Sequence, residues 1–114
     1  MFPKKNRISK REFDGLMKNG RVFHSPFFSL RIMRGGKDMS KFAFVISKKV
    51  AKNAADRNKL KRRGFHALRE IIFTPKMDMK GYMAAFFYKK EGKNMGFDEI
   101  RGEIQGLLKK SGVL

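Results

Sequence analysis

The residues best suited to chemistry in this sequence form a cationic run between Ser47 and Glu70. Eight Lys or Arg residues fall between Lys48 and Arg63, against a single acid, Asp56. Ammonium and guanidinium groups with few carboxylates nearby keep their donors available for phosphate oxygens. A solvated helix face also carries lysines, but the density of this run favours a surface that binds a polyanion.

Residues that would support catalysis or metal binding are scarce. The two histidines, His24 and His66, have no Ser, Cys or carboxylate at a spacing typical of a nucleophile or a metal site. Three acids near the C-terminus, Asp98, Glu99 and Glu103, fit the acidic start and solvent face of a helix. We therefore assign no catalytic residue, no metal ligand and no cofactor to the chain itself.

The composition narrows the class of partner. The chain has 114 residues, a net charge of +18, no cysteine, and 41% hydrophobic residues that include twelve Phe. Such an excess of positive charge suits phosphate-bearing partners, and here nucleic acid rather than a membrane. The apolar content indicates a folded chain, and the length predicts a single domain over residues 1–114. Given its charge, we expect this domain to bind nucleic acid. We expect a cytoplasmic protein without a membrane partner or a small-molecule substrate.

The cationic run must be positioned by a helix. Helical spacing of apolar residues predicts this helix over Ala54–Phe73, with Thr74-Pro75 ending it. Its buried stripe is predicted to contain Leu60, Gly64, Ala67, Leu68 and Ile71. Polar residues occupy the opposite side or flank the stripe: Asn58, Arg62 and Arg69 opposite it, Lys59 and His66 beside them, and Arg57 and Lys61 at its edges.

Two further helices are predicted. Ser9 and Glu12 form a capping box at the start of a helix over Lys10–Asn19, which Gly20 is expected to end in a left-handed conformation. The second runs from Phe97 to Lys110, acidic at its start and basic at its end, as the helix dipole favours.

Alternating apolar residues predict the strands. One is expected over Phe23–Met33 and another over Lys41–Ser47, joined by Arg34–Lys37 into an antiparallel hairpin. The stretch Tyr82–Tyr88 is apolar on both faces, which is typical of a central strand, and it is too short to cross a bilayer.

In the order of these features, the sequence resembles the bacterial ribonuclease P protein component. The resemblance rests on Lys48-Lys49 and Arg57-Asn58-x-x-Lys61-Arg62, and it extends from Asn6-Arg7-Ile8 through Gly20 to the last helix. It implies an α+β fold: a small single domain with a sheet of about four strands, three helices and a left-handed βαβ crossover, similar to domain 2 of ribosomal protein S5. Base rates alone favour a right-handed crossover.

The resemblance also implies a function. The family's protein is a subunit of a ribonucleoprotein endonuclease that removes the 5′ leader from precursor tRNA, and the RNA subunit performs the cleavage with Mg²⁺ held at the RNA. The expected partners are ribonuclease P RNA and precursor tRNA. The alternative is a structural ribosomal or general RNA-binding protein that uses the same basic helix. DNA binding is less favoured, because no dimer pattern or turn-helix reader is evident.

Two sets of site residues follow from the resemblance. The expected contacts to the RNA subunit are Lys48, Lys52, Arg57, Asn58, Lys59, Lys61, Arg62, Arg63 and Arg69. A groove between the first helix and the sheet is expected to accept the single-stranded leader, and its matching positions are Phe13, Met17, Phe28, Ser29, Arg31 and Lys49. Aromatic rings there could stack on bases, while the cations meet phosphates.

The sequence departs from the family pattern at three places. Phe65-His66 stands where the family commonly has Arg-Glu, and Arg69-Glu70 follows one turn later. Met17 replaces a second aromatic residue on the first helix, and Phe87 lies near the end of a strand that often finishes with Arg. These positions bear on the leader groove and on one contact to the RNA subunit.

Overall fold

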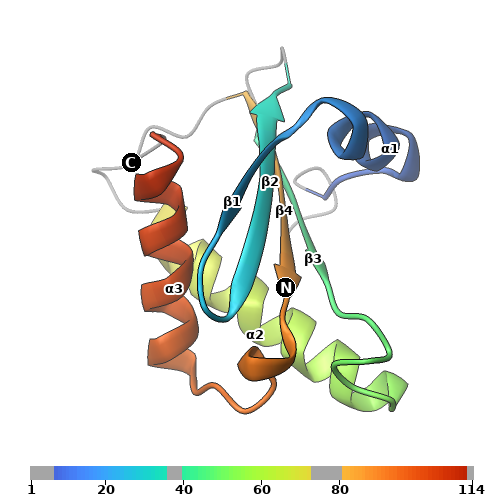
Figure 1. Ribbon diagram of the computed structural model, residues 1–114, viewed down its shortest axis with the longest axis vertical. Helices are drawn as coiled ribbons and strands as arrows, with labels where there is room; N and C mark the ends of the chain where they lie inside the picture. Colours follow the sequence, from blue (N-terminus) through green and yellow to red (C-terminus); the bar gives the residue numbers. More distant parts are fainter. Residues whose placement is uncertain (1–6, 36–39, 73–80, 113–114) are drawn as a thin grey trace.

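The computed structural model describes residues 7–35, 40–72 and 81–112. Within these ranges the chain forms one four-stranded mixed sheet with α-helices on both faces (Figure 1). In chain order the elements are α1 (Lys10–Asn19), β1 (Arg21–His24), β2 (Phe28–Arg34), β3 (Lys41–Val45), α2 (Ala54–Ile72), β4 (Tyr82–Tyr88), the short 3-10 helix η2 (Lys90–Gly92) and α3 (Phe97–Lys110). The expected α+β fold, with four strands and three α-helices, is confirmed.

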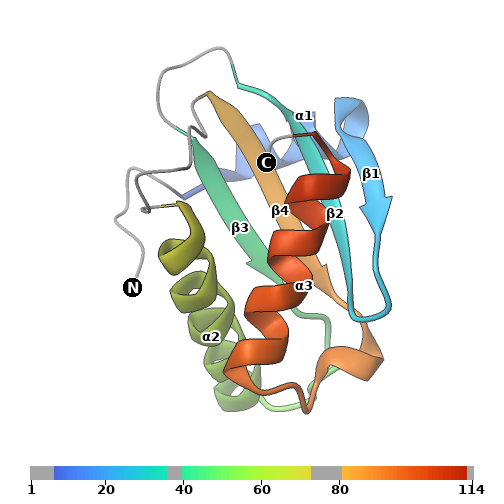
Figure 2. The same cartoon turned by 90° about the vertical axis from the view of Figure 1, so that its left-hand side faces the viewer.

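The two faces of the sheet have different roles. Helices α2 and α3 cover one face, and α1 lies against the other (Figures 1 and 2). The α2 and α3 face holds the main core, where Phe28, Leu30 and Phe86 are fully buried. The side chains between them along β2, Ser29 and Arg31, point to the α1 face, because successive residues of a strand alternate.

The strand order is β1-β2-β4-β3, so the predicted hairpin between the second and third strands is wrong. Strand β4 lies between them, antiparallel to β2 and parallel to β3. The reason is that Tyr82–Tyr88 is apolar on both faces and loses most water contact at the centre, where Ala84, Ala85 and Phe86 have no exposed surface. The prediction of a central strand is thereby confirmed.

The predicted strand over Phe23–Met33 is also corrected, because the chain reverses within it. Strands β1 and β2 form an antiparallel hairpin, and Ser25 closes the turn. The amide of Ser25 donates to the carbonyl oxygen of Phe28 at 2.9 Å, and the Phe28 amide donates to the Ser25 hydroxyl at 3.2 Å. Ser and Pro favour turns, so the Ser25-Pro26 pair is a turn signal that the prediction of one continuous strand overlooked.

The β3-α2-β4 connection is a left-handed crossover. Figure 2 views the sheet from the side of α2, with β3 and β4 both pointing down the page and β4 to the right of β3. Turned so that the strands point upward, the chain moves from right to left across the sheet with its helix in front, which is the rare hand. The expectation from the family resemblance is met.

Helix α2 packs closely on the sheet. The predicted helix and the observed one agree to within a residue, and Phe73 and Thr74-Pro75 lie outside the described residues. Every residue of the predicted apolar stripe is buried. At Gly64 an added Cβ would lie 2.6 Å from ring atoms of Phe44 on β3, so this glycine allows the close approach of helix and strand.

Helix α1 is fixed at both ends. The capping box is confirmed: the Glu12 amide donates to the Ser9 hydroxyl at 3.2 Å, and the Ser9 amide donates to the Glu12 carboxylate at 3.0 Å. The ammonium group of Lys41 on β3 donates to the same carboxylate at 2.8 Å and, together with the Ser9 amide, lowers the pKa of Glu12 to about 2. The left-handed ending predicted at Gly20 is wrong, since Gly20 is extended, with φ −70°. An added Cβ there would lie 2.6 Å from the Leu16 carbonyl oxygen, so lack of space is what favours glycine.

The last predicted helix is confirmed as α3, which buries Ile100, Ile104, Leu107 and Leu108. Among the described helices, none combines the length and the apolar character needed to cross a membrane.

Candidate nucleic-acid interface

The polar side of α2 and the loop before it form the surface that we call the basic face. Its nine members are the residues expected to contact RNA: Lys48, Lys52, Arg57, Asn58, Lys59, Lys61, Arg62, Arg63 and Arg69. Asn58, Arg62 and Arg69 are exposed, whereas Arg57 and Lys61 are half-buried beside the apolar stripe, as the helical angles predict. The amphipathic pattern of α2 therefore keeps its polar residues outside the buried stripe.

The cations between Lys48 and Arg63 have few described counter-charges. Within the described residues, no carboxylate lies within 4.0 Å of a Lys or Arg nitrogen between Lys48 and Arg63. Asp56 is the one acid in this stretch. A group of cations held together without counter-charges produces a positive potential that attracts phosphate.

Arg57 has a structural role as well as a charge. Its Nη1 donates to the carbonyl oxygens of Ala51 at 3.0 Å and of Lys52 at 2.7 Å. These bonds fasten the loop between β3 and α2 to the first turns of the helix. Arg57 therefore sets the position of the loop that carries Lys48 and Lys52.

Asn58 and Lys61 line an open cavity of about 280 Å³ on the β3 side of α2. Its other lining residues include Phe42, Phe44 and Phe65, together with Arg7 from the segment before α1. The Ile8 amide donates to the Phe42 carbonyl oxygen at 3.3 Å, which holds Arg7 beside this cavity. Sequence reasoning did not place Arg7 on the basic face, because only the tertiary fold joins these segments.

Lys59 and Arg63 occupy the other side of α2, facing the loop before α3. The Nη1 of Arg63 donates to the carbonyl oxygen of Met95 in that loop at 3.2 Å. Arg63 thus joins α2 to the segment that leads into α3. The basic face therefore extends around α2, from Lys61 on the β3 side to Arg63 beside the loop before α3.

The second candidate surface lies where α1 crosses the sheet, and we call it the α1 surface. Its described members are Phe13, Met17, Ser29, Arg31 and Phe87. The ring centroids of Phe13 and Phe87 lie 6.1 Å apart with the planes tilted by 43°, and both rings are half-buried. A half-exposed pair of rings can offer a face for base stacking. Phe87, noted in the sequence only as a departure, is an aromatic member of this surface.

Arg31 connects the two elements of the α1 surface. Its Nη1 donates to the carbonyl oxygen of Met17 at 3.2 Å, which joins β2 to the last turn of α1. Met17 is 38% exposed, unusually high for a large apolar side chain in this molecule. Ser29 lies directly opposite Phe87 in the sheet register, and Lys49 is exposed in the turn after β3.

Phe28 does not belong to the α1 surface. It has no exposed area, and its ring centroid lies 4.5 Å from that of Tyr88 in the core under α2 and α3. The period-two geometry of β2 turns Phe28 to the face opposite Ser29 and Arg31. Its expected contact with the leader is therefore corrected to a packing role.

The departure at Phe65 also has a structural explanation. Phe65 is buried, and its ring lies 4.9 Å from that of Phe44 at a steep angle of 72°. The position faces the sheet and contributes to the core. Glu70, one turn later, accepts from Arg101 of α3 at 3.1 Å, so this acid supports the contact between the two helices.

Both histidines are exposed. His24 is exposed on β1, and the His66 ring packs 5.1 Å from Phe97, with its Nε2 3.9 Å from Glu70. In the part of the chain that the structure describes, no group of three His, Asp or Glu side chains could hold a metal ion.

Comparison with known proteins places this arrangement in context. The model of the Ribonuclease P family matches residues 2–112. The ribonuclease P protein component of Clostridium kluyveri is 29% identical over 108 residues, covering 94% of this chain and 95% of that protein. The corresponding protein of Nitratiruptor is 52% identical over 54 residues, which is 47% of each chain.

Solved structures have the same fold. A mutant of the Staphylococcus aureus RNase P protein, described as defective in mRNA degradation activity, superposes with a TM-score of 0.80 at 26% identity, covering 97% of this chain and 92% of that one. The RNase P protein from Thermotoga maritima gives a TM-score of 0.77 at 24% identity, covering 91% of this chain and 96% of that one.

Proposed function

Because this chain belongs to the ribonuclease P protein family, we propose that it is the protein subunit that binds the catalytic RNA and the 5′ leader of precursor tRNA. Membership of the family implies a part in a holoenzyme that processes tRNA. The cleavage is assigned to the RNA subunit, with Mg²⁺ held by RNA. The protein contributes positioning and positive charge.

The observation that carries this proposal is the basic face. Most of its cations project from α2, whose apolar stripe is buried, and no described carboxylate pairs with those between Lys48 and Arg63. Each phosphate that such a cation neutralises releases condensed counterions, which drives binding at moderate salt. The tight packing at Gly64 and the hydrogen bonds of Arg57 and Arg63 hold these charges in defined positions.

The α1 surface is assigned to the leader. Phe13 and Phe87 would stack on unpaired bases, while Arg31 and Lys49 would meet phosphates on either side. Stacking tolerates any base, so this surface suits leaders of varied sequence. Its separation from the basic face allows one protein to contact the RNA subunit and the substrate together.

The experiment that tests the proposal also separates it from a general RNA-binding role. The reconstituted holoenzyme is assayed for its affinity for precursor tRNA with a leader and for the matching mature tRNA. A leader-binding subunit strengthens binding of the precursor only. Equal strengthening of both RNAs would support a structural or general RNA-binding protein instead.

A further inference from the structure

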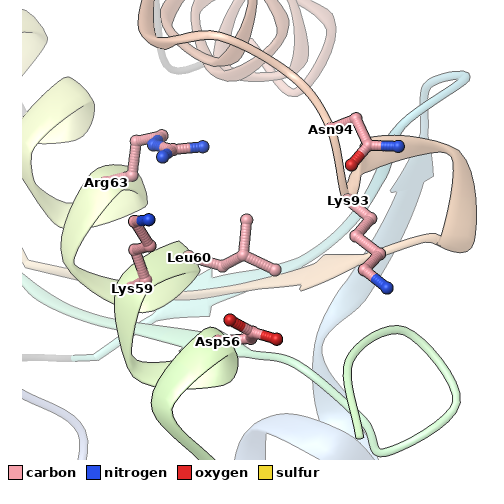
Figure 3. A pocket seen from close by; sticks show the side chains of 6 residues that line it. All are labelled: Asp56, Lys59, Leu60, Arg63, Lys93 and Asn94. Atoms are coloured by element: carbon pink, nitrogen blue, oxygen red, sulfur yellow. The ribbon is translucent and has the colours of Figure 1, made fainter. Parts of the chain in front are cut away.

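An open cavity of about 320 Å³ lies between the first half of α2 and the loop that precedes α3. Asp56, Lys59, Leu60 and Arg63 line it from α2, and Lys93 and Asn94 line it from the loop. Figure 3 shows the two groups on opposite sides of the space, with Leu60 extending between them. Lys93 and Asn94 are absent from the contacts that the sequence predicts.

The loop side of this cavity is held in a defined shape. The Gly92 amide donates to the Lys89 carbonyl oxygen at 2.9 Å, and the Met95 amide donates to the Gly92 carbonyl oxygen at 3.3 Å. Met95 is buried, and its carbonyl oxygen accepts from Arg63 across the cavity. These bonds fix Lys93 and Asn94 between two anchored residues.

The helix side is equally fixed. The Tyr88 hydroxyl donates to the carbonyl oxygen of Leu60 at 2.8 Å, and burial raises the pKa of Tyr88, which keeps this donor protonated. Leu60 itself is buried and forms the apolar base of the cavity. Hydrogen bonds within the protein therefore hold both walls of the cavity.

The charges around the cavity favour an anion. Three cationic side chains, those of Lys59, Arg63 and Lys93, face one carboxylate, that of Asp56. No described ion pair joins Asp56 to any of the three within 4.0 Å. The convergence of like charges costs free energy that a bound phosphate would offset. The volume is also many times the roughly 30 Å³ of a water molecule.

We propose that this cavity binds a phosphate of an RNA backbone and extends the RNA interface from α2 to the loop before α3. The proposal rests on the proposed function and adds Lys93 and Asn94 to it. Lys59, Arg63 and Lys93 would surround the phosphate oxygens. The Asp56 carboxylate can accept from the ribose 2′-hydroxyl, a donor that DNA lacks.

The test uses the full chain and its cognate ribonuclease P RNA. Binding is measured over a range of salt for the wild type, for Lys93→Ala, and for the control Lys90→Ala, which removes the same charge three residues away, outside the cavity. Lys93→Ala should reduce the magnitude of the log–log salt slope by about 0.7–0.9. Lys90→Ala should leave the slope unchanged. Equal slopes for the two variants would overturn the inference.

A third variant, Arg62→Ala on the exposed side of α2, separates this inference from the proposed function. If Arg62→Ala reduces the magnitude of the salt slope and Lys93→Ala does not, the assignment of a phosphate to the cavity is wrong, while the RNA-binding role of the basic face is retained. If neither substitution changes the slope, the proposed function fails as well.

Two further arms identify the ligand. Titration with inorganic phosphate, followed by the NMR amide signals of Lys93 and Asn94, tests for a free-phosphate site. Strong phosphate-induced shifts without any Lys93 effect on RNA binding would contradict the backbone assignment. Asp56→Ala should reduce the preference for a single-stranded RNA over the DNA of the same sequence. An unchanged preference would contradict the role given to the 2′-hydroxyl.

Discussion

The centroid of the Phe13 ring on α1 lies 6.1 Å from that of the Phe87 ring on β4, and both side chains are half-buried. The two residues are far apart in the chain, yet they meet because α1 crosses the sheet face that β4 presents. This pair is the aromatic part of the α1 surface. Its geometry allows a direct test of leader binding.

Replacing Phe13 by Ala should weaken the holoenzyme's affinity for precursor tRNA by roughly 1–3 kcal/mol while leaving mature tRNA binding unchanged, because only the leader stacks there. The affinity for ribonuclease P RNA should also stay the same. Phe97→Leu is the matched control, since Phe97 is another half-buried aromatic residue that lies on α3, beside His66. If Phe13→Ala weakened the binding of precursor and mature tRNA to the same degree, the assignment of Phe13 to leader binding would be wrong.

Arg57 and Arg62 should separate the structural and the ionic roles of the basic face. Arg57→Ala breaks two hydrogen bonds to carbonyl oxygens and should lower the free energy of unfolding by about 1–2 kcal/mol, measured in urea. Arg62→Ala should change it by less than about 0.5 kcal/mol, because Arg62 is exposed on the outer side of α2. Both variants should bind RNA more weakly. Equal stability of the two variants would show that Arg57 does not fasten the loop.

Glu12 should make stability depend on pH in a defined window. Its pKa falls from the ordinary 4.5 to about 2 in the folded chain, so its contribution is complete above pH 4.5 and is lost as the pH falls to about 2. Glu12→Gln keeps the capping box and removes the ion pair to Lys41, which should cost about 1 kcal/mol at neutral pH. The difference from wild type should shrink through that acid range.

The control for Glu12 is its partner. Lys41→Ala should reproduce the loss at neutral pH, and the double variant should lose little more than either single variant. A pH-independent difference between wild type and Glu12→Gln would mean that the ion pair does not contribute.

Gly64 and Gly106 give opposite predictions for the same substitution. Gly64→Ala should destabilise the fold by roughly 1–3 kcal/mol, because its Cβ would lie 2.6 Å from the Phe44 ring. Gly106→Ala on α3 meets no atom within 4 Å and should stabilise it by about 0.5–1 kcal/mol through helix propensity. Thermal unfolding of both variants measures the difference. A stabilised Gly64→Ala would show that α2 can move away from the sheet at little cost.

The helices of this fold could be predicted closely from the sequence, because their signals are local. The capping box of Ser9 and Glu12 and the apolar stripe from Leu60 to Ile71 each fall within a few turns. The strand pairing could not be predicted in the same way. Either β3 or β4 could lie beside β2, and contacts between segments more than forty residues apart in the chain decide which strand does. In the sequence, only the apolar character of both faces of Tyr82–Tyr88 indicated a central strand.

The site was predictable to a similar extent. The basic face follows from the density of Lys and Arg along one helix. Phe28 was misplaced because it was carried over from the family resemblance, although the alternation along its strand puts it on the face opposite Ser29 and Arg31. Phe87, Arg7 and Lys93 were missed because they reach their surfaces only through the tertiary fold. The left-handed crossover came from the family resemblance, since general rules favour the other hand.

The central claim, that the protein assists a catalytic RNA, is tested most directly by cleavage of precursor tRNA at limiting Mg²⁺. Cognate ribonuclease P RNA is assayed with and without the protein over a range of Mg²⁺ concentrations, alongside carefully purified protein alone. We predict that the protein lowers the Mg²⁺ needed for cleavage and that the protein alone cleaves nothing. An unchanged Mg²⁺ requirement, or cleavage by the protein without RNA, would contradict the account.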